Sequence, residues 1–350
     1  MVLESFEIIR VLLMAAFSFL LALFWEPMLH RFLIRARLGK PIRDAAHAPV
    51  FAALHAAKAG TPTMGGILVW GTTLLLALAG TFLFWLSPDS LPARFSFLTR
   101  SGTLLPMGVL VASAIVGMVD DYLNVKKIGA LWGGLRMRHR LMVYTLIAAV
   151  GAWWFSVKLD WDLLHVPFVG DFHIGLWYML FFLVVIIATA FSVNQTDGLD
   201  GLAGGTLFIA FGAYALISFA QGRYDLAVFC GVIVGALLAF LWFNIYPAKF
   251  FMGDTGAMSL GITLGVVALL TNTALLLPII GIIFVIESCT TLLQMASKKI
   301  RKKKIFLSSP IHHHLEAIGW KEPQIVMRAW VVALVFAAVG TSLALLDALM

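Results

Sequence analysis

Aspartates stand where long apolar runs of this sequence end. Two are adjacent, two are three residues apart and one follows a glycine: Asp120, Asp121, Asp197, Asp200 and Asp254. Acidic side chains at the edge of apolar segments are costly and are functional candidates by default. One aspartate alone could be a helix cap or a solvated residue. Five of them suit a hard cation such as Mg²⁺, which takes oxygen ligands and usually retains waters and substrate phosphates.

The spacing of these acids separates their expected roles. Successive residues of a helix point about 100° apart, so Asp120 and Asp121 are not expected to do the same work. One would face the metal or act as a base, while the other would orient a neighbour. Asp197 and Asp200, three residues apart, would share one face of a helix.

Glycines flank the same acids. Residues 58–66 read Lys-Ala-Gly-Thr-Pro-Thr-Met-Gly-Gly, and residues 253–256 read Gly-Asp-Thr-Gly. Glycine lets backbone N–H groups approach a ligand closely and bind anionic oxygens. The alternative is close packing of small residues between membrane helices. Packing fits Gly204 and Gly205, whereas ligand binding fits the 253–256 motif better.

Three consecutive histidines follow a serine and a proline: His312, His313 and His314 after Ser309 and Pro310. Ser309 can cap a helix whose first residue is Pro310. The apolar residues that follow recur at i, i+4 and i+7, which predicts a short amphipathic helix with an anion-favouring N-terminus. Three adjacent histidines fan around a helix and cannot all bind one zinc ion. We therefore favour contact with a substrate phosphate or pyrophosphate.

The rest of the chain indicates that a lipid bilayer is its solvent. Of 350 residues, 61% are hydrophobic and 12% are charged, with a mean hydropathy of +0.96. The net charge of +7 is interpreted as a membrane-topology signal, and no nucleic-acid partner is expected. Cys230 and Cys289 both lie in apolar runs and predict no disulfide framework. We expect a single integral membrane domain over 1–350.

Ten apolar runs are long enough to be transmembrane helices, which makes an all-α polytopic membrane fold the expectation. They lie near Ile8–Leu29, Thr63–Leu86, Leu104–Val119, Leu141–Val157, Gly175–Val193, Leu202–Phe219, Leu226–Phe243, Ala257–Thr271, Ala274–Ala296 and Ile325–Leu346. Odd-numbered loops hold 19 basic residues and even-numbered loops hold 4. Basic residues collect on cytoplasmic loops. Both termini are therefore predicted to be periplasmic, and the motifs above, all on odd loops, form a cleft that faces the cytoplasm.

Chemistry on a diphosphate at a membrane surface follows from these features. Phosphoryl transfer is catalysed mainly by positioning and charge neutralisation. The simplest interpretation is transfer of a phospho-group from a soluble nucleotide donor to a lipid acceptor. The basic run Lys298–Lys304 is expected to mark topology or attract anionic lipid. Glu287, alone within the ninth run, is either a helix–helix partner or a groove residue.

At these motifs the chain resembles the polyprenyl-phosphate N-acetylhexosamine-1-phosphate transferase superfamily. Within it, the chain is most similar to the bacterial phospho-N-acetylmuramoyl-pentapeptide transferases, over nearly its whole length. The residues that carry the resemblance are Lys58–Gly66, Asp120–Asp121, Asn194–Gly201, Asn244–Gly256 and Pro310–His314. The resemblance implies that UDP-MurNAc-pentapeptide and undecaprenyl phosphate give lipid I and UMP with Mg²⁺, at the bacterial inner membrane. It also implies a homodimer among membrane lipids.

The same resemblance implies roles for individual residues. Asp254 would be the Mg²⁺ ligand. Asp120 would deprotonate the lipid phosphate or act as a nucleophile, assisted by Asp121. Other positions would line the nucleotide and diphosphate pocket: Lys58, Thr63, Asn194, Asp197, Asp200, Asn244 and Phe251, with His312, His313 and His314 near the donor. The family has a basic residue after the aspartate pair, for which Lys126 and Lys127 are both candidates.

Two other functions compete with this one. A sister transferase that uses UDP-GlcNAc is the nearest, and the histidine triplet argues against it. A secondary transporter is the alternative from another class, because intramembrane acids also mark ion pathways. Transporter sites lie near the bilayer midplane, often between repeated halves, whereas the acids here gather at one interface and no internal repeat is visible.

Overall fold

A computed structural model describes residues 2–39, 58–100, 102–129 and 134–350. Lys40 and Arg43, which belong to the basic residues of the first loop, lie outside these ranges. The helices are α1 (Val2–Arg35), α3 (Ile67–Leu86), η2 (Pro92–Phe95), α4 (Leu104–Val125), α5 (Met137–Trp153), η3 (Trp154–Lys158), α6 (Trp177–Thr196), α7 (Leu202–Ala220), α8 (Tyr224–Asn244), α9 (Gly253–Leu270), α10 (Leu277–Ile280), α11 (Ile282–Ile300), α12 (Ile311–Ala317) and α13 (Glu322–Asp347).

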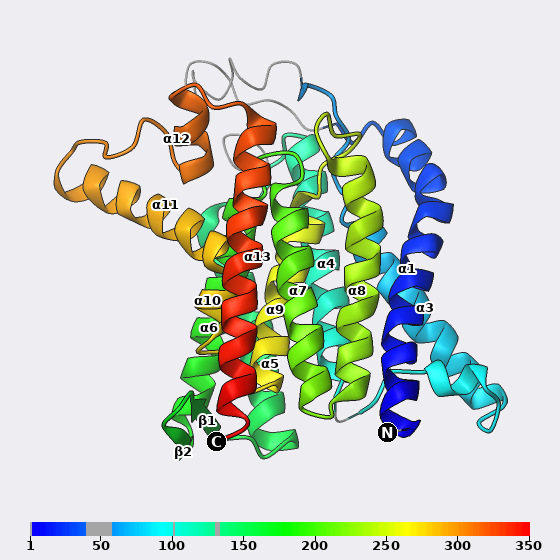
Figure 1. Cartoon of the computed structure of the whole chain (residues 1–350). Coiled ribbons are helices and arrows are strands. Elements are labelled where there is room, and N and C mark those ends of the chain that lie inside the picture. The colour runs from blue at the N-terminus through cyan, green and yellow to red at the C-terminus, as the bar shows by residue number, and fades with distance from the viewer. Residues whose placement is uncertain (1, 40–57, 101, 130–133) are drawn as a thin grey trace.

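The long helices form a bundle whose two ends differ. In the described part of the chain, nine helices are long and apolar enough to cross a membrane. Figure 1 shows the N- and C-termini at one end of the bundle and α12 at the other. The motifs at 120–121, 194–201 and 244–256 lie at the α12 end, where α4, α6 and α8 end and where α7 and α9 begin. All-helical spans are what a bilayer demands, because lipid cannot satisfy open backbone groups.

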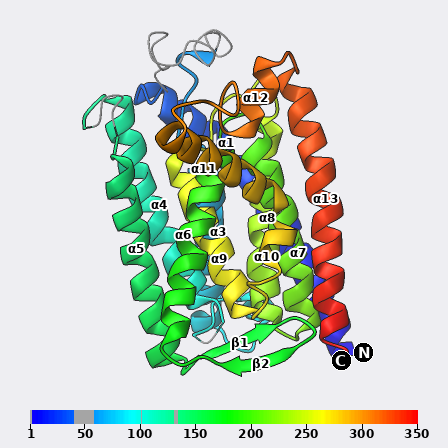
Figure 2. The ribbon, with the colours of Figure 1, turned by 90° about the vertical axis from the view of Figure 1, so that its left-hand side faces the viewer.

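Helix α9 is the core of the bundle. Every residue of α9 is buried except Asp254 in its first turn. Helices α4 and α6 pack along it, and Figure 2 shows it enclosed by its neighbours. A helix that is apolar on all sides is stable only when other helices or lipid surround it. Among the described membrane-length helices, Asp254 therefore lies on the most buried one.

The ninth predicted span is not one continuous helix. The run Ala274–Ala296 is divided into α10 and α11 at Gly281, whose backbone is not helical (φ −102°, ψ 36°). Glycine has a low helix propensity, and Pro278 in α10 supplies no amide hydrogen to a preceding turn. Beyond the break, α11 leaves the bundle at an angle (Figure 1). Four polar residues of α11 are buried, among them Glu287 and Gln294, while Leu292 and Leu293 are exposed.

The bundle is helical as expected, and a short β-hairpin is added at one of its ends. Strands β1 (Leu163–Val166) and β2 (Gly170–His173) pair antiparallel at the end of the bundle that holds the termini (Figure 2). His165 Nδ1 bonds Asp171 Oδ1 at 2.6 Å, and its Nε2 bonds Asp347 at the end of α13. Phe168 N also donates to Asp347 Oδ1, at 2.6 Å. Polar contacts at this hairpin tie it to the last helix.

His165 is expected to make the stability of this end depend on pH. Burial alone lowers the pKa of His165, but its hydrogen bonds with Asp171 and Asp347 outweigh that and raise the pKa above 6.5. This contribution to stability is therefore complete below about pH 6.5 and is lost as pH rises through the raised pKa. The thermal unfolding temperature of the wild type should fall over that window, and His165→Gln should flatten the fall. His173→Gln, in the same hairpin, is the control, because His173 is exposed; an equal change in both variants would contradict the assignment.

Candidate active site

Two acids from different helices share one arginine at the α12 end. Arg140, in the first turn of α5, places Nε 2.8 Å from Asp120 Oδ2 and Nη2 2.9 Å from Asp254 Oδ2. Asn194, near the end of α6, donates its amide to Asp254 Oδ1. Leu135 N donates to Asp120 Oδ1 at 2.5 Å. The side chains are largely buried, with 4% of Asp120, 14% of Asp254 and 19% of Arg140 exposed.

Asp121 contacts different groups from Asp120, because neighbouring residues of a helix point in different directions. Its Oδ2 accepts a hydrogen bond of 3.0 Å from Thr255 N, in the first turn of α9. Thr63 Oγ1 lies 3.5 Å from its other oxygen. The first amides of a helix have no partner within the helix, so a carboxylate from a neighbouring helix can cap them. Asp121 thus fixes the start of α9, and with it Asp254.

Glycines make this contact between α4 and α9 close enough. A Cβ atom on Gly117 would lie 2.4 Å from Asp254 O, and one on Gly66 would lie 2.2 Å from the Cα of Gly256. The amides of Gly65 and Gly66 donate to the carbonyls of Phe251 and Met252, at 2.7 and 2.9 Å. In this part of the site the glycines bring backbones together rather than presenting N–H groups to a ligand, which corrects the sequence interpretation. Gly204 and Gly205 do pack against side chains, as expected.

A second charged cluster adjoins the first through the same loops. Lys58 Nζ lies 2.7 Å from Asp200 Oδ1 and 2.5 Å from Glu322 Oε1. Glu322 Oε1 also accepts the Asp200 amide at 2.7 Å. The ammonium lies 6.0 Å from the centre of the Phe251 ring. Three segments distant in sequence are therefore joined by one carboxylate from the first turn of α13.

Removing Glu322 is expected to weaken this junction. Hydrogen bonds to charged groups contribute about 1.5–3 kcal/mol each, so Glu322→Ala should lower thermal stability and the kcat/KM for the donor together. Glu322→Gln is the matched control, because its amide oxygen can still accept from Lys58 and from the Asp200 amide. It should lie closer to the wild type than to the alanine variant in both measurements. Equal losses in the two variants would show that the negative charge, and not the hydrogen-bond acceptor, is what matters.

The remaining predicted pocket residues divide between structural and accessible positions. Asn244 is buried, with its amide bonded to Gly201 N at 3.0 Å and Phe250 O at 2.8 Å, so it joins two loops. Asp197 follows the end of α6 and is half-buried. Lys127 is exposed at the end of α4 with a positive φ of 55°. In the described residues, the cation on Asp120 and Asp254 is Arg140, and not Lys126 or Lys127.

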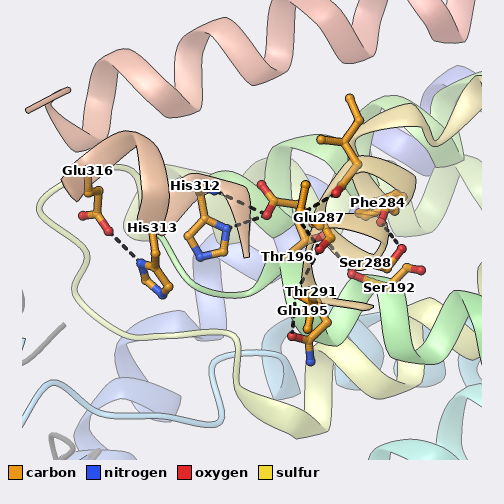
Figure 3. A network of polar contacts seen from close by, with 12 residues as sticks. Ser192, Gln195, Thr196, Phe284, Glu287, Ser288, Thr291, His312, His313 and Glu316 are labelled. Carbon is orange, nitrogen blue, oxygen red and sulfur yellow. Dashed lines mark hydrogen bonds and ion pairs between the residues drawn. The ribbon is translucent and has the colours of Figure 1, made fainter. Parts of the chain in front are cut away.

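The three histidines have three different environments (Figure 3). His312 is 1% exposed, and its Nδ1 lies 2.9 Å from Glu287 Oε2. His313 Nδ1 lies 2.7 Å from Glu316 Oε2. His314 Nδ1 accepts from Leu307 N at 3.3 Å. The triplet is therefore not one ligand set, as the fan of a helix requires.

Arg140 and Glu322 are the functional candidates that sequence reasoning missed. In the sequence Arg140 contributes only to the topology charge, and the basic partner of the aspartate pair is expected at Lys126 or Lys127 instead. Glu322 opens an apolar helix, where a carboxylate is ordinary because it favours the helix dipole. Neither residue has a signal in the sequence that would point to its partners.

Comparison with known proteins identifies the family of this chain. The model for glycosyl transferase family 4 matches residues 103–272. The phospho-N-acetylmuramoyl-pentapeptide-transferase signature 1 matches residues 58–68. The phospho-N-acetylmuramoyl-pentapeptide-transferase of Chloroflexus aurantiacus is 40% identical over 97% of this chain and 91% of its own length. This chain belongs to the phospho-N-acetylmuramoyl-pentapeptide-transferase family.

Further members show the same extent of similarity. The transferase of that name from Geobacillus kaustophilus is 41% identical over 94% of this chain and 96% of its own length. The one from Shouchella clausii is 37% identical over 96% of this chain. The matched signature contains Lys58 and Thr63, and the family model contains both acids that Arg140 joins. Membership in a transferase family and the bundle of apolar helices together make this a membrane-embedded transferase.

Proposed function

We propose that this transferase moves phospho-MurNAc-pentapeptide from UDP-MurNAc-pentapeptide to undecaprenyl phosphate, giving lipid I and UMP. The observation that carries the proposal is the Asp120–Arg140–Asp254 cluster at one end of a membrane bundle. At the end of a membrane bundle, the cluster lies where a water-soluble nucleotide donor can meet a lipid acceptor. The names of the related proteins supply the donor's identity.

The donor set fits Mg²⁺. Asp254 and Asp120 offer hard carboxylate oxygens on either side of Arg140, which already places positive charge there. The described residues hold no group of three His, Cys, Asp or Glu side chains arranged for a metal. Mg²⁺ is usually bound by one or two carboxylates together with substrate phosphates. We propose Asp254 as the principal ligand; the chemistry that Mg²⁺ supplies when bound is neutralisation of diphosphate charge.

The acceptor needs little activation. A phosphate monoester has a second pKa near 6 and is largely ionised at neutral pH, so its oxygen can attack the phosphorus that carries the sugar. One P–O bond forms to the lipid phosphate, and the bond to the bridging oxygen of UMP breaks. Asp120 and Arg140 would orient the acceptor phosphate, while Lys58, Phe251 and the histidines would hold the donor.

Direct attack predicts that no covalent intermediate forms on the enzyme. With labelled UDP-MurNAc-pentapeptide and no lipid acceptor, the wild type should retain no phospho-sugar after denaturation. Mass spectrometry of the peptide that contains Asp120 checks this. A phospho-sugar on Asp120 would replace direct attack with a two-step mechanism.

The placement in the membrane is part of the proposal. The chain leaves α9 at the end with the termini and returns to the α12 end through α10 and α11 together (Figure 1). We count α10 and α11 together as one broken crossing, which with the nine long helices gives ten crossings. Both termini are then periplasmic, and the site faces the cytoplasm of a bacterial inner membrane. We also propose a homodimer, since most soluble and membrane oligomers are symmetric dimers.

The test of the function is UMP release by purified protein from UDP-MurNAc-pentapeptide and undecaprenyl phosphate, with and without Mg²⁺. Release that requires both substrates and the metal is expected. UDP-GlcNAc in place of the donor should give none. Turnover with UDP-GlcNAc alone would assign the chain to the sister activity.

A further inference from the structure

Glu287 is a buried acid within the broken ninth span that the transfer chemistry does not use. Its side chain is 4% exposed and lies in the second turn of α11. Its Oε2 lies 2.9 Å from His312 Nδ1 and 3.5 Å from His312 N. A carboxylate removed from water is costly unless it is paired and hydrogen-bonded. The described surroundings satisfy it mainly through one imidazole.

The contact with Glu287 determines which ring nitrogen of His312 carries the hydrogen. An ionised carboxylate only accepts hydrogen bonds, so the hydrogen of His312 must be on Nδ1. Nε2 is then left for another partner. Among the described residues Nε2 has no hydrogen-bond partner, and it is buried. Buried polar atoms are almost always paired, so an unpaired one calls for a ligand or water.

The unpaired nitrogen faces the loop that follows α6. A Cβ atom on Gly198 would lie 2.2 Å from His312 Nε2. Gly198 lies between Asp197 and Asp200, in the motif that also holds Asn194, the partner of Asp254. The absence of a side chain at position 198 therefore allows the imidazole edge to meet this motif. Figure 3 shows the His312 ring beside the Glu287 carboxylate, to which it is joined by a hydrogen bond.

A second side chain of the same helix face shows what a purely structural contact looks like. Gln294, seven residues after Glu287, bonds Phe306 O at 2.8 Å and the amides of Ile305 and Phe306 at 2.9 and 3.0 Å. The Gln294 side chain thus bonds only backbone atoms of the segment that follows α11. Glu287, in contrast, contacts an imidazole ring whose far nitrogen is unpaired.

We propose that Glu287 is a positioning residue that fixes the tautomer and direction of His312, so that Nε2 is presented to the donor side of the site. This inference rests on the proposed function and deepens it: Nε2 would contact a polar group of the bound nucleotide-sugar donor beside the 194–201 motif. The carboxylate–imidazole arrangement is the one by which proteins orient histidines that bind metals, where losing the carboxylate costs about 10- to 100-fold. The break at Gly281 has a role in this arrangement, because a straight ninth helix would not direct α11 toward α12.

Side chains that imitate one ring nitrogen at a time provide the test. Asparagine places its amide near the position of Nδ1, and glutamine near that of Nε2. His312→Asn should keep the contact with Glu287 and lose activity, whereas His312→Gln should retain more. Glu287→Gln, whose oxygen can still accept from Nδ1–H, should stay near the wild type. Glu287→Ala should lower kcat/KM for the donor about 10- to 100-fold and leave KM for the lipid acceptor unchanged.

A double-substitution cycle and a matched control separate positioning from folding. If Glu287 acts through His312, then Glu287→Ala should have no further effect when added to His312→Ala. Gln294→Ala, on the same helix face and holding the same segment, should leave the donor kcat/KM nearly unchanged. An equal loss from Glu287→Ala in both backgrounds, or an equal loss from Gln294→Ala, would overturn the proposal.

A spectroscopic measurement makes the outcome independent of turnover. In ¹⁵N-histidine-labelled protein in nanodiscs, His312, assigned by its disappearance in His312→Gln, should show hydrogen on Nδ1. Glu287→Ala should change that pattern. An unchanged pattern would refute the positioning role. A wild type that releases no UMP yet shows the pattern would instead refute the proposed function.

Discussion

Asp254→Asn is expected to abolish Mg²⁺-dependent UMP release, with a fall in kcat of about 10³-fold or more. Asp254 is the only partly exposed residue of the buried helix α9, so it is the carboxylate that a ligand can reach from solvent. Asparagine has nearly the same shape, but it loses the charge that attracts the cation and offers one oxygen instead of two. The measurement is UMP release over a Mg²⁺ titration. If the metal site is weakened, any remaining activity should need a higher Mg²⁺ concentration than in the wild type.

The chain provides a matched control for that variant. Asp225 also pairs with an arginine, with Oδ1 2.6 Å from Arg10 Nη2, but at the end of the bundle that holds the termini. Asp225→Asn removes the same charge from the same kind of ion pair and should keep full activity. Near-normal turnover by Asp254→Asn would remove Asp254 from the metal site. Equal losses from both variants would show that an ion pair anywhere in the bundle is enough to explain the effect.

Arg140→Gln is expected to be the other severe variant, because it leaves two carboxylates facing each other without their cation. Removing one partner of a buried ion pair costs about 3–5 kcal/mol, and Asp120 and Asp254 both lose Arg140. Turnover should fall by about 10²-fold or more, as when a preorganised charge is removed from a reaction centre. Thermal stability without Mg²⁺ should fall as well.

Mg²⁺ should restore part of that stability. A ligand that binds only the folded state stabilises it more when it binds more tightly. Two uncompensated carboxylates should bind a cation more tightly than two that share an arginine. The rise in unfolding temperature on adding Mg²⁺ should therefore be larger in Arg140→Gln than in the wild type. Arg10→Gln, which breaks the Glu7 and Asp225 pairs at the other end, should be destabilised without this response. A response of the same size in all three proteins would argue against a metal site between Asp120 and Asp254.

The electrostatics of the cluster explain why the arginine is there. Nε of Arg140, although 2.8 Å from Asp120 Oδ2, is not aligned for a hydrogen bond with any described residue. The contact is therefore mainly ionic. Mg²⁺ would compete for the same carboxylate oxygens. Without substrate and metal, Arg140 offsets the repulsion between the two negative charges. This is consistent with an arginine, which is always charged and reaches two partners with one planar group.

Much of the fold could be predicted, because membrane helices are specified locally. A run of about 20 apolar residues must be a helix in lipid, whatever surrounds it. Nine of the ten predicted runs are helices that could span a membrane in the described residues. The exception, Ala274–Ala296, is as apolar as the others, but Gly281 and the buried polar face of α11 divide it. Where a helix breaks depends on what its far half can pack against, which hydropathy does not record.

The candidate site was predictable as a set of residues but not as a set of contacts. The sequence by itself determined the residue types: acids at helix ends, glycines beside them and basic residues concentrated in alternate loops. It also determined that Asp120 and Asp121 differ, since the helical repeat separates neighbours by about 100°. Only the tertiary structure decided that Arg140 joins Asp120 to Asp254, that Glu322 joins Lys58 to Asp200, and that Glu287 meets His312. The residues in contact lie between 20 and 264 residues apart. Because ion pairs have no sequence periodicity, only the packing of the helices brings such partners together.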